Sequence, residues 1–332
     1  MKILVIRTSA IGDVFLSGGF AQYIKTVYPD CELHWLAEKR CSAVLENISY
    51  IDKIIIWERN RKAGIKGLFD SAKDLDLDKD YDLTIDLQCL LKLFPILKKI
   101  KSKKKAGISE YEFPMNIFYD KIYPTKRFEP LKEKYHRLAK EILGYDGPAL
   151  DPIVSYTEAD RKKAEVFFEE NNLKKAVACV FATSKIHKYW ETEKWTELGR
   201  EIGKKYNAKC ILFGAGSDRE YAQAIMKNSD DFVSAVGKFS IMESMACLSL
   251  CSACVSTDTA LMHFSTIMNK PTVSLYGTNF FYAHHYGREN AAIIYKGDKN
   301  NKDRKVPDDV CMKNMKAIEV ADVMNALAGF LP

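Results

Sequence analysis

The strongest constraint on the fold of this chain is a segment in which two short apolar runs flank one helical run. It covers residues 253–277, ACVSTDTALMHFSTIMNKPTVSLYG. The apolar runs have the length and composition of buried strands, and the residues between them have helical spacing. The segment therefore predicts a strand, a tight turn, a helix and a second strand. This is the repeating unit of an open parallel sheet.

The turn in this segment predicts a ligand site. Ser256, Thr257 and Asp258 are all competent helix caps, so we expect the helix to begin at Thr259 with its free backbone N–H groups beyond the strand end. Such a helix start attracts anions, and ligands of open parallel sheets bind beyond the carboxyl ends of the strands. The candidate site residues of this segment are Asp258, Thr259, Ala260 and His263.

A purely structural role explains the same residues. Asp258 would then only cap the helix, and His263 would be a core histidine with its hydrogen bonds satisfied. The pattern of this one segment leaves both interpretations open.

The length and composition indicate a globular, soluble protein of about two domains. The chain has 332 residues, of which 47% are hydrophobic and 28% charged, as in globular soluble proteins. It contains no run of about 18 apolar residues that could span a membrane. The opening KILVIRTSAIGDV has no signal-peptide cleavage pattern, so we expect a cytoplasmic location.

The nine cysteines lie mostly in apolar strand-like or helix-like stretches, so disulfides are not expected. Cys247, Cys251 and Cys254 have spacings that suggest zinc. However, the first two fall on an apolar helix and the third in a strand, so no metal site is predicted.

The net charge of +6 is modest, but lysines gather in residues 92–107 and 59–66. Such runs are usually solvated helix ends. They would also suit an anionic membrane surface or a phosphorylated acceptor. Nucleic acid is less favoured as a partner, because no stacking aromatic residues alternate with the lysines.

Strands and helices alternate along the whole chain, which predicts an α/β fold with doubly wound parallel sheets. KILVIR, CELHWLAE, KIIIWE and YDLTIDLQ are predicted strands of the first domain, with one helix over VFLSGGFAQYIKTVY. Prolines and glycines mark a boundary near residues 145–155. Thr192 is the expected cap of the helix EKWTELGREIGKKY in the second domain. We expect domains at 1–150 and 151–315, and a C-terminal helix at 316–332 that packs across the hinge.

The turn TSAIGD after the first strand lacks the G-x-G-x-x-G pattern of dinucleotide-binding proteins. Glu38 is the nearest candidate for the acidic residue of that pattern. The turn instead offers Gly12, which lets the backbone approach a ligand, and Asp13, a carboxylate at a helix start. Asp13 is either a helix cap or a base.

Two loops of the second domain offer groups for phosphate and ribose. FATSKIHKYW places Thr183, Ser184, Lys185 and Lys188 at a strand end, where hydroxyl and ammonium groups can hold phosphates. GAGSDRE follows the next strand, where Gly214 permits close approach and Asp218 can accept hydrogen bonds from ribose hydroxyls. Solvated lysines and a plain turn are the alternative interpretations.

Together, KILVIRTSAIGD, YDLTIDLQCLLK, TSKIHKYW and STDTALMH resemble glycosyltransferase family 9, the ADP-heptose:lipopolysaccharide heptosyltransferases, over nearly the whole chain. The resemblance puts Asp13 on the catalytic aspartate and Lys188 on the essential lysine. CMKNMKAIEVADVMNAL resembles the closing cysteine and helix. Cys89 and Ala260 stand where the family has glycine. The resemblance implies donor contacts from Thr183, Ser184, Lys185, Gly214, Asp218, Phe239, Asp258, Thr259, Ala260 and His263.

The acceptor side of the resemblance is less complete. Arg59, Arg61 and Lys62 resemble a basic cluster that faces the anionic acceptor in heptosyltransferases of type I, and Gly12 belongs to the same side. Tyr111 stands near a position where an acceptor-binding arginine is expected.

The resemblance implies a GT-B fold, with two facing Rossmann-like domains, acceptor on the first and nucleotide-sugar on the second. It implies inverting, metal-independent transfer of a heptose from ADP-heptose to a Kdo sugar on lipid A, at the inner face of the inner membrane and with no cofactor. A base, cations at the leaving diphosphate and exclusion of water are what this reaction needs. The alternatives are a GT-B enzyme for another nucleotide-sugar, such as an epimerase, and a non-catalytic nucleotide-sugar-binding protein.

Overall fold

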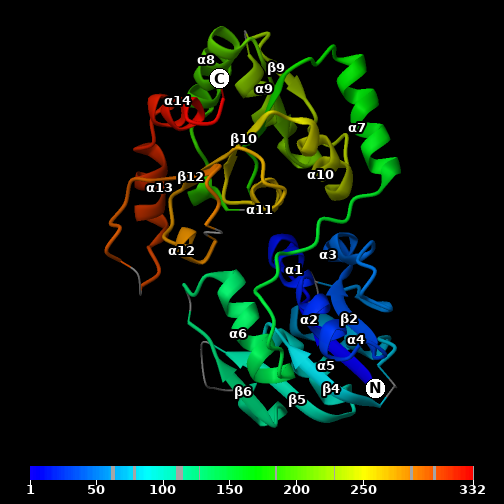
Figure 1. Cartoon of the computed structure of the whole chain (residues 1–332). Helices are drawn as coiled ribbons and strands as arrows, with labels where there is room; N and C mark the ends of the chain where they lie inside the picture. Colours follow the sequence, from blue (N-terminus) through cyan, green and yellow to red (C-terminus); the bar gives the residue numbers. More distant parts are fainter. Residues whose placement is uncertain are drawn as a thin grey trace. The chain divides into compact units, whose positions relative to one another are not determined.

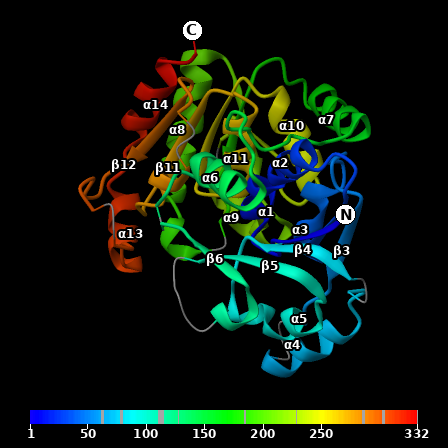
Figure 2. The same ribbon diagram turned by 60° about the horizontal axis from the view of Figure 1, so that its bottom comes forward.

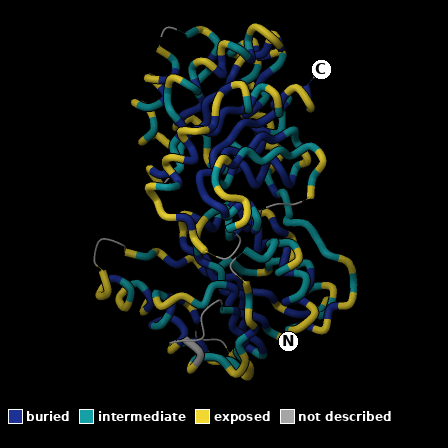
Figure 3. Tube along the Cα trace, turned by 90° about the vertical axis from the view of Figure 1, so that its left-hand side faces the viewer, coloured by how far each residue is buried: buried dark blue, intermediate teal, exposed yellow. Residues whose placement is uncertain are grey.

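The chain forms two compact units, Met1–Ser155 and Tyr156–Pro332, each an α/β body around its own sheet (Figure 1). In Figure 3 the buried parts of the trace run through the interior of each unit. The computed structural model describes residues 1–60, 64–77, 80–109, 115–126, 128–183, 185–227, 229–284, 287–301 and 304–331.

The first unit contains a parallel sheet of six strands in the order β3-β2-β1-β4-β5-β6. This is the Rossmann order, which reverses between β1 and β4. The strands are β1 (Lys2–Ile6), β2 (Glu32–Glu38), β3 (Lys53–Trp57), β4 (Tyr81–Asp86), β5 (Ser102–Ser109) and β6 (Lys121–Pro124).

Helices of the first unit connect these strands and cover the sheet. The sequence predicts one helix over residues 14–28, but the structure has two, and the first begins at Ile11. The break falls at Gly18 and Gly19, residues of low helix propensity. The helices and 3₁₀ turns are α1 (Ile11–Gly18), α2 (Phe20–Val27), α3 (Lys39–Ser42), η1 (Ala43–Leu45), α4 (Gly64–Lys73), η2 (Leu91–Leu93), α5 (Phe94–Lys99), η3 (Met115–Phe118) and α6 (Leu131–Leu143).

Strand β5 overlaps the end of the lysine-rich run 92–107, for which a solvated helix end was the usual interpretation. Lys103 and Lys104 are exposed, whereas Ala106, Gly107 and Ile108 are buried between β4 and β6. The lysines hide the strand from sequence analysis, because only its second half carries the apolar signal of a buried strand.

The second unit repeats the same architecture in the order β12-β11-β10-β7-β8-β9, and its order reverses between β7 and β10. All its strand pairs are parallel. The strands are β7 (Ala176–Val180), β8 (Lys209–Phe213), β9 (Phe232–Ser234), β10 (Ala253–Thr257), β11 (Thr272–Tyr276) and β12 (Ala291–Tyr295).

Two helix starts of the second unit differ by one residue from those expected. The helix after β10 begins at Ala260, with Thr259 as its cap, and the helix after β7 begins at Thr192, with Glu191 as its cap. The helices and 3₁₀ turns are α7 (Glu158–Glu170), η4 (Ile186–Lys188), α8 (Thr192–Tyr206), η5 (Gly216–Asp218), α9 (Arg219–Met226), α10 (Ile241–Leu250), α11 (Ala260–Ile267), α12 (Phe281–His284), α13 (Asp308–Lys316) and α14 (Val320–Ala328).

The C-terminal segment forms two helices, α13 and α14, where the sequence predicts one. Val320, Val323 and Leu327 of α14 are buried in the core of the second unit, and this helix packs against α8, β11 and β12. Among the residues that the structure describes, no helix is long and apolar enough to cross a membrane.

Candidate functional site

The reversal of strand order in the second sheet brings the two predicted donor segments together. Strands β7 and β10 are neighbours in register, with Val255 opposite Cys179. The loop from residue 181 and the turn at Asp258 therefore leave the sheet side by side at its carboxyl edge. This is the position at which open α/β sheets bind ligands.

Lys188 and Asp258 are in direct contact at this edge. The Lys188 Nζ atom donates a hydrogen bond to Asp258 Oδ2 at 2.6 Å. The side chains are 22% and 7% exposed, so the ion pair is only weakly screened by water. Asp258 thus pairs with a lysine 70 residues away, and the cap of α11 is Thr259.

The start of helix α11 lies next to this ion pair. The side chain of its N-cap residue, Thr259, makes no capping hydrogen bond, and the backbone of Thr259 is extended with φ −142° and ψ 172°. His263 lies one turn further and is buried, as the helical spacing predicts. The exposed partial positive charge of a helix start and the Lys188 ammonium group together favour a diphosphate at this edge.

The loops after β8 and β9 approach the same edge closely. Gly237 donates a backbone hydrogen bond to Gly214 at 3.0 Å, and a Cβ at Gly214 would lie 3.2 Å from Ala182. Asp218 accepts a hydrogen bond from the Ala215 N–H at 2.7 Å, which fixes one oxygen of its carboxylate within its own turn.

Phe239 follows β9 and packs edge-on against Phe167 of α7, with ring centroids 5.1 Å apart. Its ring is partly exposed, so one apolar side chain borders the edge where a nucleobase is predicted. Thr183 and Lys185 lie in the loop after β7, whereas Ser184 lies outside the described residues.

In the first unit, Asp13 lies in the first turn of α1. Its Oδ2 atom accepts a hydrogen bond from the N–H of the N-cap residue Ala10 at 3.2 Å, so it stabilises the helix start from the third helical position, as in a capping box. Its Oδ1 atom also lies 3.2 Å from the guanidinium of Arg7, and the carboxylate is 41% exposed. The cap accounts for one oxygen, and the second oxygen faces a cation. Gly12 precedes Asp13 in the same turn.

Arg7 is a site residue that sequence analysis did not single out. Its NH1 group donates to the Leu87 carbonyl at 2.6 Å, which anchors it to the loop after β4. Burial works against the charged guanidinium, but the Asp13 carboxylate, Tyr135 and Asp86 hold the pKa of Arg7 above its ordinary value. Its position directly after the buried run KILVI is the signal that could have found it.

Asp86 and Cys89 organise the loop after β4. Asp86 is fully buried and accepts hydrogen bonds from Tyr119 at 2.6 Å and from the N–H groups of Gln88 and Cys89. Burial nevertheless raises the pKa of the Asp86 carboxyl. Cys89 has φ +47°, a backbone conformation that favours glycine. Its Sγ atom fits because Gly107 opposite has no side chain.

A cation cluster surrounds the buried carboxylate of Glu38 at the carboxyl end of β2. Lys92 Nζ lies 2.8 Å from this carboxylate, Arg40 Nε 3.2 Å and Arg59 NH1 3.8 Å. The three cations outnumber the one carboxylate, so the cluster has a positive net charge that suits an anionic ligand. Lys92 and Arg40 were not predicted as site residues. Arg59 was predicted, and Arg61 and Lys62 lie outside the described residues, as does Tyr111.

A cavity of about 410 Å³ opens beside this cluster. Trp57 is one of the residues around it, and the ring centroid of Trp57 lies 5.8 Å from the Arg59 guanidinium carbon. The lining residues are Glu38, Lys39, Arg40, Trp57, Glu58, Arg59 and Asn60.

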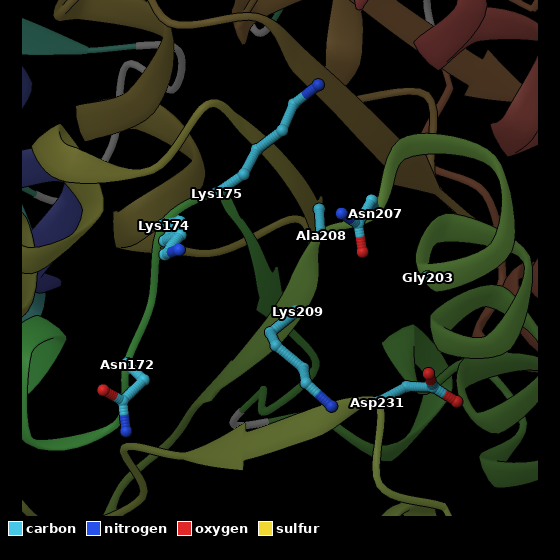
Figure 4. A pocket seen from close by; sticks show the side chains of 8 residues that line it. All are labelled: Asn172, Lys174, Lys175, Gly203, Asn207, Ala208, Lys209 and Asp231. Atoms are coloured by element: carbon cyan, nitrogen blue, oxygen red, sulfur yellow. The ribbon is translucent and has the colours of Figure 1, made fainter.

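A second cavity, of about 260 Å³, lies at the opposite edge of the second sheet (Figure 4). Lys175 and Lys209 lie at the amino ends of β7 and β8, and Figure 4 shows their side chains running in different directions. The Lys209 ammonium group donates to the Asp230 carbonyl. This cavity contains none of the predicted site residues.

The sheets of the two units and the site at the edge of the second sheet indicate a class of protein. Each unit has a Rossmann-type sheet, and the second carries the Lys188–Asp258 ion pair beside a helix start at its carboxyl edge, where open α/β sheets bind their ligands. The family model of glycosyltransferase family 9 (heptosyltransferase) matches residues 72–309. The chain therefore belongs to this family, and the predicted GT-B fold class is confirmed.

The chain is 24% identical to lipopolysaccharide heptosyltransferase 1 of Campylobacter coli over 346 aligned positions, covering 99% of both chains. A crystal structure of a family 9 glycosyl transferase from Veillonella parvula has a TM-score of 0.84 and 20% identity, covering 99% of this chain and 96% of that one. The Escherichia coli heptosyltransferase WaaC with ADP-2-deoxy-2-fluoro heptose has a TM-score of 0.71 and 20% identity, covering 99% of both chains.

Proposed function

We propose that this protein is an inverting, metal-independent heptosyltransferase that moves a heptose from ADP-heptose to an anionic inner-core acceptor, a Kdo sugar on lipid A. The observation that carries the proposal is the Lys188–Asp258 ion pair beside the start of α11. Two similar proteins, a lipopolysaccharide heptosyltransferase 1 and a heptosyltransferase solved with ADP-2-deoxy-2-fluoro heptose, support the same donor.

Lys188 and the α11 start are assigned to the leaving diphosphate. Negative charge grows on the ADP β-phosphate as the glycosidic bond breaks, and a fixed ammonium group with helix N–H groups stabilises that charge. In this proposal Asp258 holds Lys188 in place before the donor binds. Thr183, Ser184, Lys185, Gly214, Asp218, Phe239, Ala260 and His263 complete the proposed donor site.

Asp13 is assigned the role of general base. It takes the proton of the acceptor hydroxyl as that oxygen attacks the anomeric carbon from the face opposite ADP, which inverts the configuration. A base needs an ionised and accessible carboxylate, and Asp13 is 41% exposed beside Arg7.

The acceptor is assigned to the first unit. The Glu38 cation cluster and its cavity offer Arg59 and Lys92 to carboxylate or phosphate groups of the acceptor. We assign Gly12, Arg61 and Lys62 to the same side. Because this acceptor is lipid-linked, we place the enzyme at the inner face of the inner membrane.

Mass spectrometry of the product formed from ADP-heptose and Kdo-lipid A tests the proposal. A mass increase of one heptosyl residue on the acceptor supports it. A different sugar transferred, or epimerised donor with unchanged acceptor, would establish the alternative of another nucleotide-sugar enzyme. Binding of ADP-heptose without any product would leave a non-catalytic binding protein.

A further inference from the structure

Helices α4 and α5 contact each other (Figure 2), and exposed apolar side chains lie on α4 and directly before α5. Ile65 is 76% exposed, and Phe69, one turn later on the same stripe of α4, is 44% exposed. Leu91, just before α5, is 62% exposed. We call these three residues the apolar anchors. Single exposed apolar residues are ordinary, but three on two adjoining elements form a patch.

A contact between two aromatic rings connects the helices of this patch, and lysine side chains lie beside it. The ring of Phe69 meets Phe94 of α5 edge-on, with centroids 6.1 Å apart. Lys98 Nζ lies 4.7 Å from the centroid of Phe94. Lys66 is exposed and follows Ile65 directly. The anchors are therefore set among ammonium groups, as on helices that lie in a lipid interface.

The two segments around the apolar anchors carry a positive net charge as large as that of the whole protein. Residues 64–77 and 90–105 contain nine lysines and three aspartates, with no arginine or glutamate. Their excess equals the formal net charge of +6 of the whole chain. Asp70 and Asp76 are paired with Lys73 and Lys53, and Lys92 and Lys103 are paired with Glu38 and Asp82 outside the region. The region is thus complementary to an anionic surface.

We propose that the apolar anchors and the surrounding lysines form the face by which this protein docks on an anionic lipid bilayer. The proposal rests on the proposed function only in that the acceptor is lipid-linked. Lysines attract the anionic headgroups, and the anchors insert at the boundary with the acyl chains.

The place of the anchors in the fold suits a lipid-linked acceptor. Ile65 and Leu91 lie in segments that follow the carboxyl ends of β3 and β4. Arg59 and Lys92 of the Glu38 cation cluster follow the same strand ends. Docking by the anchors therefore brings the cation cluster to the depth of the headgroups.

Co-sedimentation tests the proposal, with vesicles of phosphatidylcholine alone and of phosphatidylcholine with phosphatidylglycerol. The wild type is expected to bind only the anionic vesicles and to lose binding as salt rises. The variant I65S/F69S should bind at least tenfold more weakly, because two anchors are lost. The variant K66Q/K98Q should bind about thirtyfold more weakly at low salt and depend less on salt.

The control V166S/M312S removes two exposed apolar residues from helices of the second unit, 38% and 46% exposed, and should bind within twofold of wild type. The single variant I65S, which disturbs no packed side chain, guards against misfolding of the double variant. Equal binding to neutral vesicles, unchanged binding by both test variants, or no binding by the wild type would overturn the proposal. Self-association that depends on the anchors without vesicle binding would also overturn it.

Turnover of ADP-heptose with a deacylated, water-soluble Kdo acceptor separates this proposal from the proposed function. If I65S/F69S loses vesicle binding but keeps this turnover, the docking face is supported. If vesicle binding follows the expected pattern but the wild type has no turnover, the proposed function fails and the docking face stands.

Discussion

Lys188 and Asp258 form a 2.6 Å ion pair between two loops that follow neighbouring strands at the reversal point of the second sheet. The pair holds the Lys188 ammonium group beside the start of α11. This arrangement is preorganised, so the lysine needs no reorientation when negative charge develops on a departing diphosphate.

Replacement of Lys188 by alanine should lower the turnover number by about 10² or more, because charge that grows in the transition state loses its partner. The Michaelis constant for ADP-heptose should change much less. Steady-state kinetics at saturating acceptor measure both. The matched control is Lys185→Ala in the same loop, with a smaller expected effect on turnover. If only the Michaelis constant rises, Lys188 is a binding residue and its assigned role is wrong.

ADP should raise the melting temperature of the protein, since a ligand that binds only the native state stabilises it by mass action. At an ADP concentration of 100 times the dissociation constant, the stabilisation is about 2.7 kcal/mol. Asp258→Ala should weaken the shift, because Lys188 loses the partner that positions it. Thermal shifts with ADP, UDP and GDP are the measurement. An equal shift with UDP, or none with ADP, would remove the adenine assignment.

Replacement of Arg7 by glutamine should move the acidic limb of the pH–rate profile to higher pH. The Arg7 cation lies 3.2 Å from the Asp13 carboxylate and favours its ionised form, so removing the cation makes the base lose activity at a higher pH. Arg7→Lys keeps the charge and should restore the wild-type limb. If the acidic limb of the pH–rate profile is the same in Arg7→Gln and in the wild type, Arg7 only supports the loop.

Replacement of Arg59 by alanine should raise the Michaelis constant for the Kdo acceptor about tenfold or more, since a charge-assisted hydrogen bond to an acceptor anion is lost. The constant for ADP-heptose should not change. Lys53→Ala, at the amino end of the same strand β3, is the control. A rise in the donor constant alone would place Arg59 on the wrong substrate.

Much of the fold follows from local pattern. Continuous apolar runs such as AVACV and ACVST predict buried parallel strands, and the stripe of Trp195, Leu198 and Ile202 predicts the buried face of α8. Strand β5 was missed because its first residues are lysines. Observed helix starts differ from the predicted ones by one to three residues. At Asp258 and Thr259, several neighbouring residues can serve as the cap.

Which side chains meet in the site depends on the order of the strands in the sheet. No local sequence pattern gives this order. The sequence indicates that Lys188 and Asp258 each follow a strand, but their contact requires β7 and β10 to be neighbours. The same holds for Lys92, which belongs to a lysine-rich run yet lies 2.8 Å from Glu38 at the end of β2. Long-range ion pairs were therefore the part of the site that sequence analysis could not predict.

The central claim is that Asp13 acts as a base and not only as a helix cap, and Asp13→Asn tests it most directly. Asparagine can keep the hydrogen bond from the Ala10 N–H but loses the Arg7 ion pair, so ADP affinity should stay near wild type while the melting temperature falls slightly. The amide cannot accept the acceptor's proton, so the initial rate at saturating ADP-heptose and acceptor should fall by roughly 10² to 10⁴. A variant that retains more than about a tenth of wild-type turnover would contradict the account and leave Asp13 as a cap.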